Sequence, residues 1–227
     1  MLQLDIPPYR LSGVVYSALL NHRPQWTALG EAASQAPYKA PAKAPVLAIK
    51  PRNTIAASGA KVAVPAEGGE MTVGATLAIL IGRTACRVAA SEALGVVASY
   101  GVVADLSVPH DSHYRPAVRL KARDASCVIG PEFIAASRLP DPDALNVQVH
   151  VDDQLALASS TGDRVRGVAQ LIADVTDFMT LQPGDVLLLG ESFGAPVVRA
   201  GHRVMVTIDG IGSLHFDMTN EYEGSAS

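Results

Sequence analysis

The sequence predicts a mixed α/β fold that is rich in β-strands. Short apolar or alternating runs recur along the chain, which is the pattern of strands, whereas only two segments look helical. The chain has 227 residues, 48% of them hydrophobic, so it can build one substantial core. We expect a single domain over residues 1–227, with an irregular proline-rich N-terminal region (1–60) packed on it and a mobile tail (221–227).

The expected strands are of two kinds. Two continuous apolar runs, 76–82 and 186–190, each end in glycine and have the pattern of strands covered on both faces. Alternation of apolar and polar residues predicts half-buried strands, with turns at Asp152-Asp153 and at Gly210. The alternating segments are 145–151, the QLALAS run that follows it, and 202–212, and a short strand is expected at 46–50.

Two segments are predicted to be helical. Ser91 is a candidate N-cap for the stretch that follows it, residues 92–103. The clearer helix lies near residues 164–179, where apolar side chains recur at three- and four-residue spacing and form one face. Thr161 and Asp163 are candidate caps for this helix.

Composition limits the class of protein. The net charge is −4 and no long basic stripe offsets it, which argues against a nucleic-acid ligand. The apolar runs are far shorter than the ~20 residues of a membrane span, so no membrane segment is expected. Cys86 and Cys127 form no Cys-x-x-Cys pair, and two isolated cysteines fit a reducing compartment. We therefore expect a soluble cytoplasmic protein.

A cluster of cations stands out against this acidic background. Arg119, Lys121 and Arg123 alternate with apolar residues, so a strand over 118–123 would carry all three on one face, and Arg115 lies just upstream. Such a face would suit an anionic ligand, because guanidinium groups match carboxylates and phosphates. The alternative is an edge strand whose charges deter pairing with other strands.

Asp105 and Lys121 are the candidate chemical groups. Asp105 ends an apolar run, where an ionised carboxylate needs a cation or a metal as its partner. Lys121 lies among other cations, which would lower its pKa and suit proton transfer or the stabilisation of an enolate. The alternatives are an ordinary aspartate at a strand end and a solvated lysine on a strand.

General sequence motifs do not define a function. His110 and His113 have a spacing compatible with metal ligation on a helix, but Pro109 and the polar neighbours argue against a helix there. The sequence has no phosphate loop, no dinucleotide-binding glycine pattern and no Gly-x-Ser-x-Gly elbow.

Longer strings resemble those of the fumarylacetoacetate hydrolase superfamily. Within this superfamily, the strings resemble more specifically the N-terminal half of the bifunctional isomerase/decarboxylases of 4-hydroxyphenylacetate (homoprotocatechuate) breakdown. It covers nearly the whole chain, from about residue 13 to residue 212. The strings are NHR (21–23), SQAPYKAP (34–41), IKPRNT (49–54), YRPA (114–117), KARD (121–124) and LQPGD (181–185).

This resemblance implies a strand-rich fold with a central β-roll and a few peripheral helices, usually dimeric. Members of the superfamily bind Mg²⁺ or Mn²⁺ through a Glu-x-Glu pair and a later Asp, and hard oxygen ligands suit those cations. The metal holds a 2-oxo acid whose enolate forms on loss of CO₂ or a proton. The implied reactions are decarboxylation of 5-oxopent-3-ene-1,2,5-tricarboxylate and isomerisation of 2-hydroxyhepta-2,4-diene-1,7-dioate.

The resemblance assigns roles to individual residues. Asp105 falls on the metal-ligand Asp, and Lys121 falls on the catalytic lysine that faces the substrate. Arg119 and Arg123 are expected to bind the substrate, and so are Glu191 and Ser192, which stand in the Gly-Thr-Pro loop of the superfamily.

Two departures from the superfamily pattern are clear. Gly74-Ala75-Thr76 occupies the position of the Glu-x-Glu pair, and Gln25 and Ala28 lie near the positions of the lid His and Glu. A single carboxylate holds Mg²⁺ or Mn²⁺ poorly, so the metal is absent from this chain unless Glu67 and Glu70 replace the pair.

Three hypotheses follow. The chain is a subunit whose metal site is supplied by a homologous second chain; or it is a self-sufficient enzyme; or it is a non-catalytic homologue that keeps an anion-binding pocket. The expected ligand is a polycarboxylate 2-oxo acid. The expected assembly is a homodimer or a hetero-oligomer with the homologous second subunit.

Overall fold

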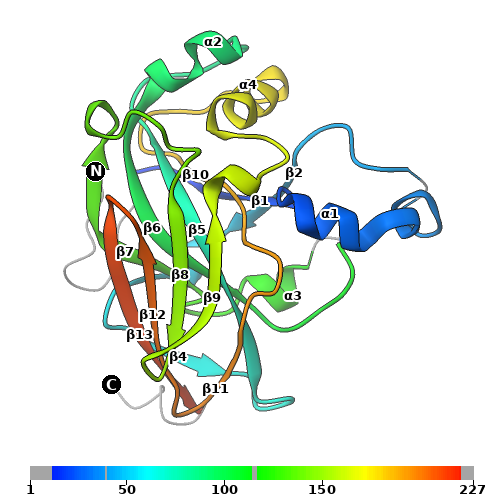
Figure 1. Cartoon of the computed structure of the whole chain (residues 1–227), viewed down its shortest axis with the longest axis vertical. Helices are drawn as coiled ribbons and strands as arrows, with labels where there is room; N and C mark the ends of the chain where they lie inside the picture. Colours follow the sequence, from blue (N-terminus) through cyan, green and yellow to red (C-terminus); the bar gives the residue numbers. More distant parts are fainter. Residues whose placement is uncertain (1–11, 39, 114–116, 221–227) are drawn as a thin grey trace.

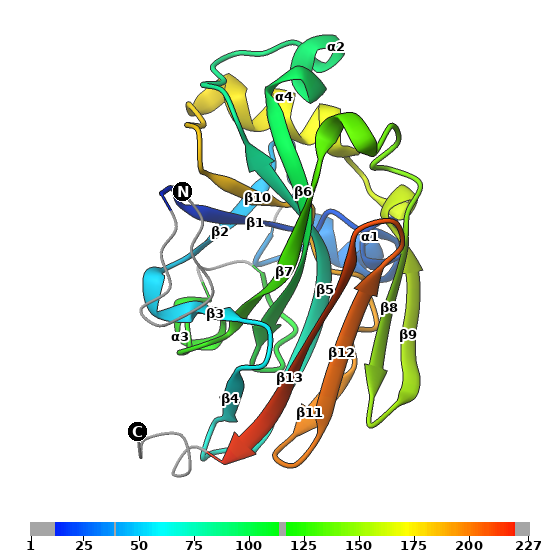
Figure 2. The same cartoon turned by 90° about the vertical axis from the view of Figure 1, so that its left-hand side faces the viewer.

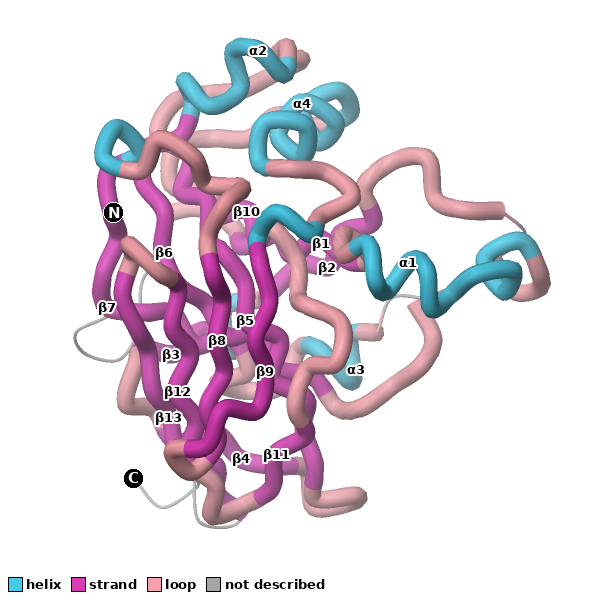
Figure 3. The backbone as a smooth tube through the Cα atoms, viewed as in Figure 1, coloured by secondary structure: helices cyan, strands magenta, loops and turns pink. Residues whose placement is uncertain are grey.

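Two β-sheets pack against each other and enclose the main apolar core (Figure 1 and Figure 2). They are seen in a computed structural model of the chain, which describes residues 12–38, 40–113 and 117–220. The strands gather at the centre of the molecule, whereas the helices lie at its periphery (Figure 3). This arrangement confirms the predicted strand-rich fold with a curled central sheet and a few peripheral helices.

The larger sheet has eight strands. They are β1 (Val15–Leu19), β2 (Val46–Lys50), β3 (Ile55–Ala57), β5 (Glu70–Ile81), β6 (Val97–Ser107), β7 (Cys127–Ala135), β10 (Val186–Leu188) and β11 (Val197–Arg199). Their order is β2-β1-β10-β5-β6-β7-β3, and β11 also pairs with β5. The β1–β10 and β3–β7 pairs are parallel, and the others are antiparallel.

The smaller sheet has five strands in the order β4-β13-β12-β8-β9. They are β4 (Lys61–Val64), β8 (Asn146–Val151), β9 (Gln154–Ser160), β12 (Arg203–Ile208) and β13 (Gly212–Asn220). The predicted hairpin at Asp152-Asp153 joins β8 to β9, and both of these residues have positive φ. The predicted half-buried strands are confirmed for β8 and β12, where buried and exposed residues alternate. The QLALAS run does form β9, but no residue of that strand is buried.

Within the described residues, four α-helices lie around the sheets: α1 (Arg23–Leu29), α2 (Ala90–Ala93), α3 (Val118–Lys121) and α4 (Val168–Phe178). Short 3₁₀ turns cover 30–34, 52–54, 94–96, 136–138 and 161–163. The apolar face of α4 is buried, as its periodicity predicts. The predicted caps Thr161 and Asp163 are wrong, because they lie in a separate 3₁₀ turn. The first turn of α4 is instead capped by Asp143, whose carboxylate accepts a hydrogen bond from the Val168 amide at 2.9 Å.

The predicted helix after Ser91 is wrong beyond its first turn. Only Ala90–Ala93 and the 3₁₀ turn 94–96 are helical, and the chain then enters β6 at Val97. Nearly every residue of β6 is buried, because the sheet is covered on both faces there. A fully buried strand has no alternation in its sequence, so its apolar run can be mistaken for a buried helix.

The N-terminal region is less irregular than predicted. Between residues 15 and 57 it contributes β1, β2 and β3 to the larger sheet. Residues 1–11 and the predicted mobile tail (221–227) lie outside the described residues. Across the ranges that the structure describes, no helix is both long and apolar enough to cross a membrane.

The two faces of the larger sheet have different roles. Along β5, the side chains of Val73, Leu77 and Ile79 point into the main core between the two sheets. Ala78, on the opposite face, joins a smaller apolar cluster that includes Val186 of β10. This second face also carries the buried ionic groups described below.

Candidate functional site

Asp105 is the centre of a buried ionic cluster. Its side chain is 2% exposed, and its Oδ1 lies 2.8 Å from Nζ of Lys50, a lysine with a fully buried side chain. Ser17 Oγ donates to Oδ2 at 2.6 Å, and Lys121 Nζ lies 4.0 Å from the same oxygen. A buried carboxylate needs such partners, because charge without compensation is costly in the protein interior.

Four separate elements bring these groups together. Ser17 lies on β1, Lys50 ends β2, Asp105 lies near the end of β6, and Lys121 ends α3. The Lys50 ammonium also donates to the carbonyl oxygen of Lys121, and to Ser126 Oγ at 3.2 Å. Lys50 therefore fixes both the carboxylate of Asp105 and the backbone that carries Lys121.

The expected strand over residues 118–123 is wrong, because residues 118–121 form the single helical turn α3. Residues two apart in a helix point about 200° away from each other, whereas in a strand they share a face. Lys121 consequently points inward and is buried, Arg119 points outward and is exposed, and Arg123 is half-buried. The three cations do not form one face, and Arg115 lies outside the described residues.

The pKa of Lys121 is raised, not lowered as the sequence suggests. Burial alone would lower it, but the carboxylates of Asp105 and Glu191 outweigh that effect. Burial would likewise raise the pKa of Asp105, but Lys121, Lys50 and the hydrogen bond from Ser17 hold it below 3.8. Lys121 therefore acts as a fixed cation opposite two carboxylates.

Glu191 fills the space above Gly74. Its Oε1 lies 3.6 Å from Lys121 Nζ, and its side chain is 16% exposed. Gly74 pairs with Asp105 in the β5–β6 register, and a Cβ at position 74 would collide with Oε2 of Glu191. It would also come within 2.7 Å of the Asp105 carbonyl oxygen and 2.8 Å of Glu191 Cβ. A larger side chain at position 74 is therefore incompatible with this position of Glu191.

Thr76 holds the loop that carries Glu191. Its Oγ1 accepts a hydrogen bond from the Gly190 amide at 3.0 Å. Gly190 has a φ of 109° and a side chain there would meet the Ala18 carbonyl oxygen at 2.9 Å, so the sharp turn requires glycine. Gly74 and Thr76 thus accommodate and fix the loop at the two positions where the superfamily pattern has carboxylates.

The residues present do not fit the expected Mg²⁺ or Mn²⁺ site. Asp105 is already engaged by two lysines and Ser17. Among the described residues, no group of three or more His, Cys, Asp and Glu is placed to hold a metal ion. The suggested substitutes are elsewhere: Glu67 is exposed in a turn, and Glu70 pairs with Arg199 at the surface. The rings of His110 and His113 contact each other, but among the described residues they belong to no group that could hold a metal ion.

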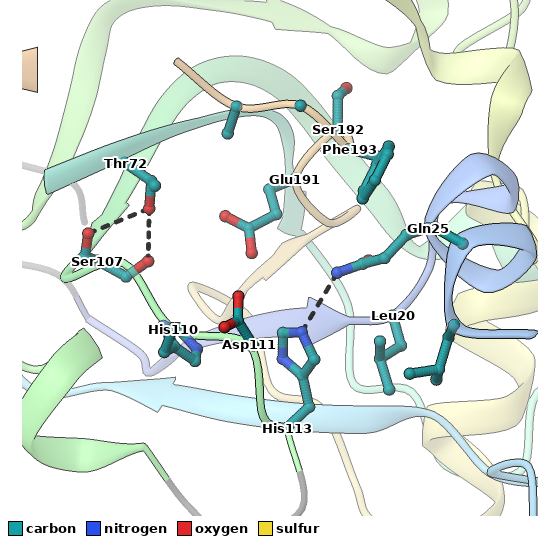
Figure 4. Close-up of a pocket in the computed structure, with 14 residues that line it drawn as sticks. Leu20, Gln25, Thr72, Ser107, His110, Asp111, His113, Glu191, Ser192 and Phe193 are labelled. Carbon is teal, nitrogen blue, oxygen red and sulfur yellow. Dashed lines mark hydrogen bonds between the residues drawn. The ribbon is translucent and has the colours of Figure 1, made fainter. Parts of the chain in front are cut away.

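A pocket of about 410 Å³ opens beside the ionic cluster (Figure 4). Glu191 and Ser192 line it from the loop after β10, and His110 and His113 line it from the loop after β6. Its other lining residues are Leu20, Gln25, Ala28, Leu29, Thr72, Ser107, Asp111, Phe193, Gly194 and Ala195. The expected substrate-binding residues Glu191 and Ser192 therefore share one pocket, whereas Arg119 and Arg123 are not among the residues that line it.

A buried arginine lies behind the pocket wall. Arg164 is 2% exposed and its Nη2 donates to Ser192 Oγ at 3.2 Å. Within the described residues, its Nε and Nη1 have no hydrogen-bond partner. Burial lowers its pKa to about 10, against opposing effects of Asp163 and Glu191, so the guanidinium is charged at neutral pH. This role could not be predicted from the sequence, in which Arg164 is only the first residue of the expected helix 164–179.

We predict that the cost of a side chain at position 74 depends on Glu191. Gly74→Ala should lower the free energy of unfolding by about 1–3 kcal/mol, because it overpacks the site. In a Glu191→Gly background the cost should fall by at least about 0.5 kcal/mol, because two of the three close contacts disappear. Urea unfolding of the four proteins measures this coupling.

Gly130→Ala in β7 is the matched control, since its Cβ would approach Val102 and not Glu191. Its cost should be the same with and without Glu191. A Gly74→Ala cost that is unchanged in the Glu191→Gly background would show that Glu191 does not occupy this space.

We further predict that Asp105 makes stability depend on acid pH. Its folded pKa is below its unfolded value of 3.8. Its contribution is therefore complete above about pH 5 and is lost as the pH falls below 4 toward the folded pKa. Asp105→Asn should cost about 3–5 kcal/mol at pH 7, because it leaves buried lysines undercompensated, and should flatten the pH dependence between 5 and 3.

Urea unfolding at several pH values measures both effects. Asp217→Asn is the control, since the Arg203–Asp217 pair is exposed and should contribute little. Equal losses for Asp105→Asn and Asp217→Asn would contradict a buried, compensated Asp105.

Comparison with known proteins identifies the family of the chain. The family model for fumarylacetoacetate (FAA) hydrolase, C-terminal, matches residues 14–219. The 4-hydroxyphenylacetate degradation bifunctional isomerase/decarboxylase of Escherichia coli is 38% identical over 213 residues, which cover 94% of this chain and 48% of that protein. The chain thus spans about half the length of this and two similar curated relatives that it matches.

Solved structures show the same fold. The fumarylpyruvate hydrolase of Pseudomonas aeruginosa, in complex with Mn²⁺ and pyruvate, has a TM-score of 0.79 at 23% identity and covers 96% of this chain and 95% of that chain. The maleylpyruvate hydrolase of Sphingobium sp. SYK-6, in complex with manganese(II) and pyruvate, has a TM-score of 0.74 at 28% identity and covers 91% of this chain and 70% of that chain. On these grounds the chain belongs to the fumarylacetoacetate hydrolase family.

Proposed function

We propose that this chain is one subunit of a decarboxylase/isomerase that acts on 2-oxo polycarboxylates in aromatic-compound catabolism. The proposed reactions are decarboxylation of 5-oxopent-3-ene-1,2,5-tricarboxylate and isomerisation of 2-hydroxyhepta-2,4-diene-1,7-dioate. Support comes from the E. coli relative, whose name carries both activities and whose length is about twice the matched region. A structure named 2-hydroxyhepta-2,4-diene-1,7-dioate isomerase, from Mycobacterium marinum, also resembles this chain, with a TM-score of 0.73 at 25% identity.

One observation carries the proposal of a partner. The place of the expected metal ligands is taken by Glu191 over Gly74 and by the hydroxyl of Thr76, which holds the same loop. The carboxylate of Asp105 is neutralised by Lys50 and Lys121. Loss of CO₂ from a 2-oxo acid needs an electron acceptor at the oxo group, and Mg²⁺ or Mn²⁺ supplies one when bound. We therefore assign the metal to a homologous second chain.

The pocket of this chain supports the binding of an acid. Ser192, Thr72 and Ser107 are hydroxyl-bearing residues among those that line it. The charged guanidinium of Arg164 lies directly behind Ser192, and Lys121 lies behind Glu191. We propose that Ser192 binds a substrate carboxylate and that Glu191 contacts the substrate beside it. Arg119 and Arg123 are left out of this assignment, because neither lines the pocket.

A second candidate function is a non-catalytic homologue that binds an anion. The observation that favours it is the same replacement of the metal ligands. In this view the chain contributes fold and stability to an assembly, and its pocket holds a ligand without converting it.

Reconstitution with a homologous chain that carries an intact Glu-x-Glu pair tests the proposal. We expect no CO₂ release from the tricarboxylate by this chain alone with Mg²⁺, and CO₂ release by the purified complex of the two chains. A partner with its Glu-x-Glu pair changed to Gln-x-Gln is the control, and its complex should release none. Substrate absorbance and CO₂ trapping provide the two measurements.

The other outcomes separate the alternatives. Equal CO₂ release by this chain alone would contradict the need for a partner. The absence of CO₂ release from every pairing, with a partner that is folded and metal-loaded, would favour the non-catalytic role.

A further inference from the structure

The pocket brings a carboxylate and an imidazole to the same cavity from two distant segments of the chain. Figure 4 shows Glu191 and His113 facing this cavity, Glu191 from the loop after β10 and His113 from the loop after β6. A carboxylate paired with a neutral imidazole is a known arrangement for moving a proton next to a carbonyl group. Metal-dependent decarboxylation in a partner chain would require neither of these two residues.

His113 is held in place by the N-terminal part of the chain. Its Nε2 lies 3.4 Å from the amide nitrogen of Gln25 on α1, and its backbone amide donates to the hydroxyl of Tyr38 at 2.8 Å. With the Gln25 amide nitrogen as the donor, Nε2 of His113 accepts and the ring proton is assigned to Nδ1. Gln25 thus fixes both the orientation and the tautomer of the ring.

His113 and Gln25 each have one polar side-chain atom that is not hydrogen-bonded within the described residues. Nδ1 of His113 and Oε1 of Gln25 are buried, and neither has a hydrogen-bond partner among the residues that the structure describes. Buried polar atoms in native proteins are nearly always paired with protein, water or ligand. Gln25 and His113 both line the pocket, so a polar group bound there can supply the missing partners, a hydrogen-bond acceptor in the case of the Nδ1–H.

His113 is neutral under physiological conditions. Burial lowers its pKa to about 4, and the nearby His110 and Lys121 add to this effect, while Asp111 opposes it. A neutral imidazole that donates from Nδ1 can stabilise an enolate oxygen by a hydrogen bond without transferring its proton.

Glu191 has the complementary properties. Its carboxylate lies 3.6 Å from the buried ammonium of Lys121, which orients it, and its side chain is partly exposed to the pocket. It can accept a proton from a ligand and return it without leaving this position.

We propose that this pocket catalyses metal-independent proton transfer at the carbon beside the oxo group of a 2-oxo acid, with Glu191 as the base and His113 as the donor to the oxo oxygen. The inference rests on the proposed function for its substrate class, and it assigns the isomerisation step to this chain itself. Decarboxylation remains with the metal-bearing partner.

The step balances without any co-reactant. Glu191 takes a proton from C3, the C–H electron pair forms the C2=C3 double bond, and the carbonyl electron pair moves to the oxygen that His113 hydrogen-bonds. Return of the proton to C3 restores the oxo acid. In a conjugated 2-hydroxy-2,4-diene the proton leaves the hydroxyl group instead. Glu191 takes that proton, the double bonds move to C2=O and C3=C4, and return of the proton to C5 gives the isomer. No electrons are gained or lost overall.

Exchange of the pyruvate methyl protons in D₂O tests the proposal. Proton NMR follows the loss of the methyl signal with the full chain in excess EDTA, so that no metal takes part. We expect enzyme-dependent exchange, reduced about 100-fold in Glu191→Gln and in His113→Gln. His150→Gln, in β8 of the other sheet, is the matched histidine control and should exchange at the wild-type rate.

Folding is checked by the melting temperature of each variant. If Glu191→Gln does not fold, Glu191→Asp keeps the charge opposite Lys121 but retracts the carboxylate, and it should also exchange slowly. Exchange that persists at the wild-type rate in folded His113→Gln or in the folded Glu191 variant would overturn the proposal.

Saturation-transfer NMR of pyruvate separates failure of this inference from failure of the proposed function. Pyruvate that binds to the chain but does not exchange in EDTA would overturn the inference and leave the proposed function standing. Pyruvate that binds neither to the chain nor to its complex with the partner would count against both.

Discussion

The buried ion pair between Lys50 and Asp105 is the constraint on which the rest of the site depends. Its two side chains are 0% and 2% exposed, and the pair links the edge strand β2 to the central strand β6. Removing one partner of such a pair typically costs about 3–5 kcal/mol, because the other charge is left buried. Through the carbonyl of Lys121, the same ammonium fixes α3, and α3 in turn places the cation that orients Glu191.

Charge balance explains how this site differs from a metal centre. Two lysines face two carboxylates, Asp105 and Glu191, so the cluster is neutral without a divalent ion. Glycine at position 74 leaves room for Glu191, so one carboxylate comes from a loop and not from β5. The chemistry open to the chain shifts accordingly, from electron withdrawal by a metal toward proton transfer between side chains and a bound acid.

The sequence predicted most of the fold but only part of the site. Alternation identified β8 and β12, and helical periodicity identified α4, because each of these elements has one covered face. The buried strand β6 lacks such a signal, and the single turn α3 is too short to show one. Asp105 and Lys121 stood out from their neighbours in the sequence, and Glu191 came from a resemblance. The partnerships of Asp105 with Lys50 and of Ser192 with Arg164 were not predicted, and they join residues 55 and 28 positions apart. Contacts of that kind depend on strand order and register, which one sequence does not reveal.

Manganese binding to the isolated chain tests whether a lysine–carboxylate cluster stands in place of the metal site. Electron paramagnetic resonance reports free Mn²⁺, and it can be followed during titration with the chain, with and without pyruvate. A homologue with an intact Glu-x-Glu pair serves as the positive control. We expect the signal of free Mn²⁺ to stay undiminished at micromolar protein concentrations. Micromolar binding that is strengthened by pyruvate and abolished by Asp105→Asn would contradict it.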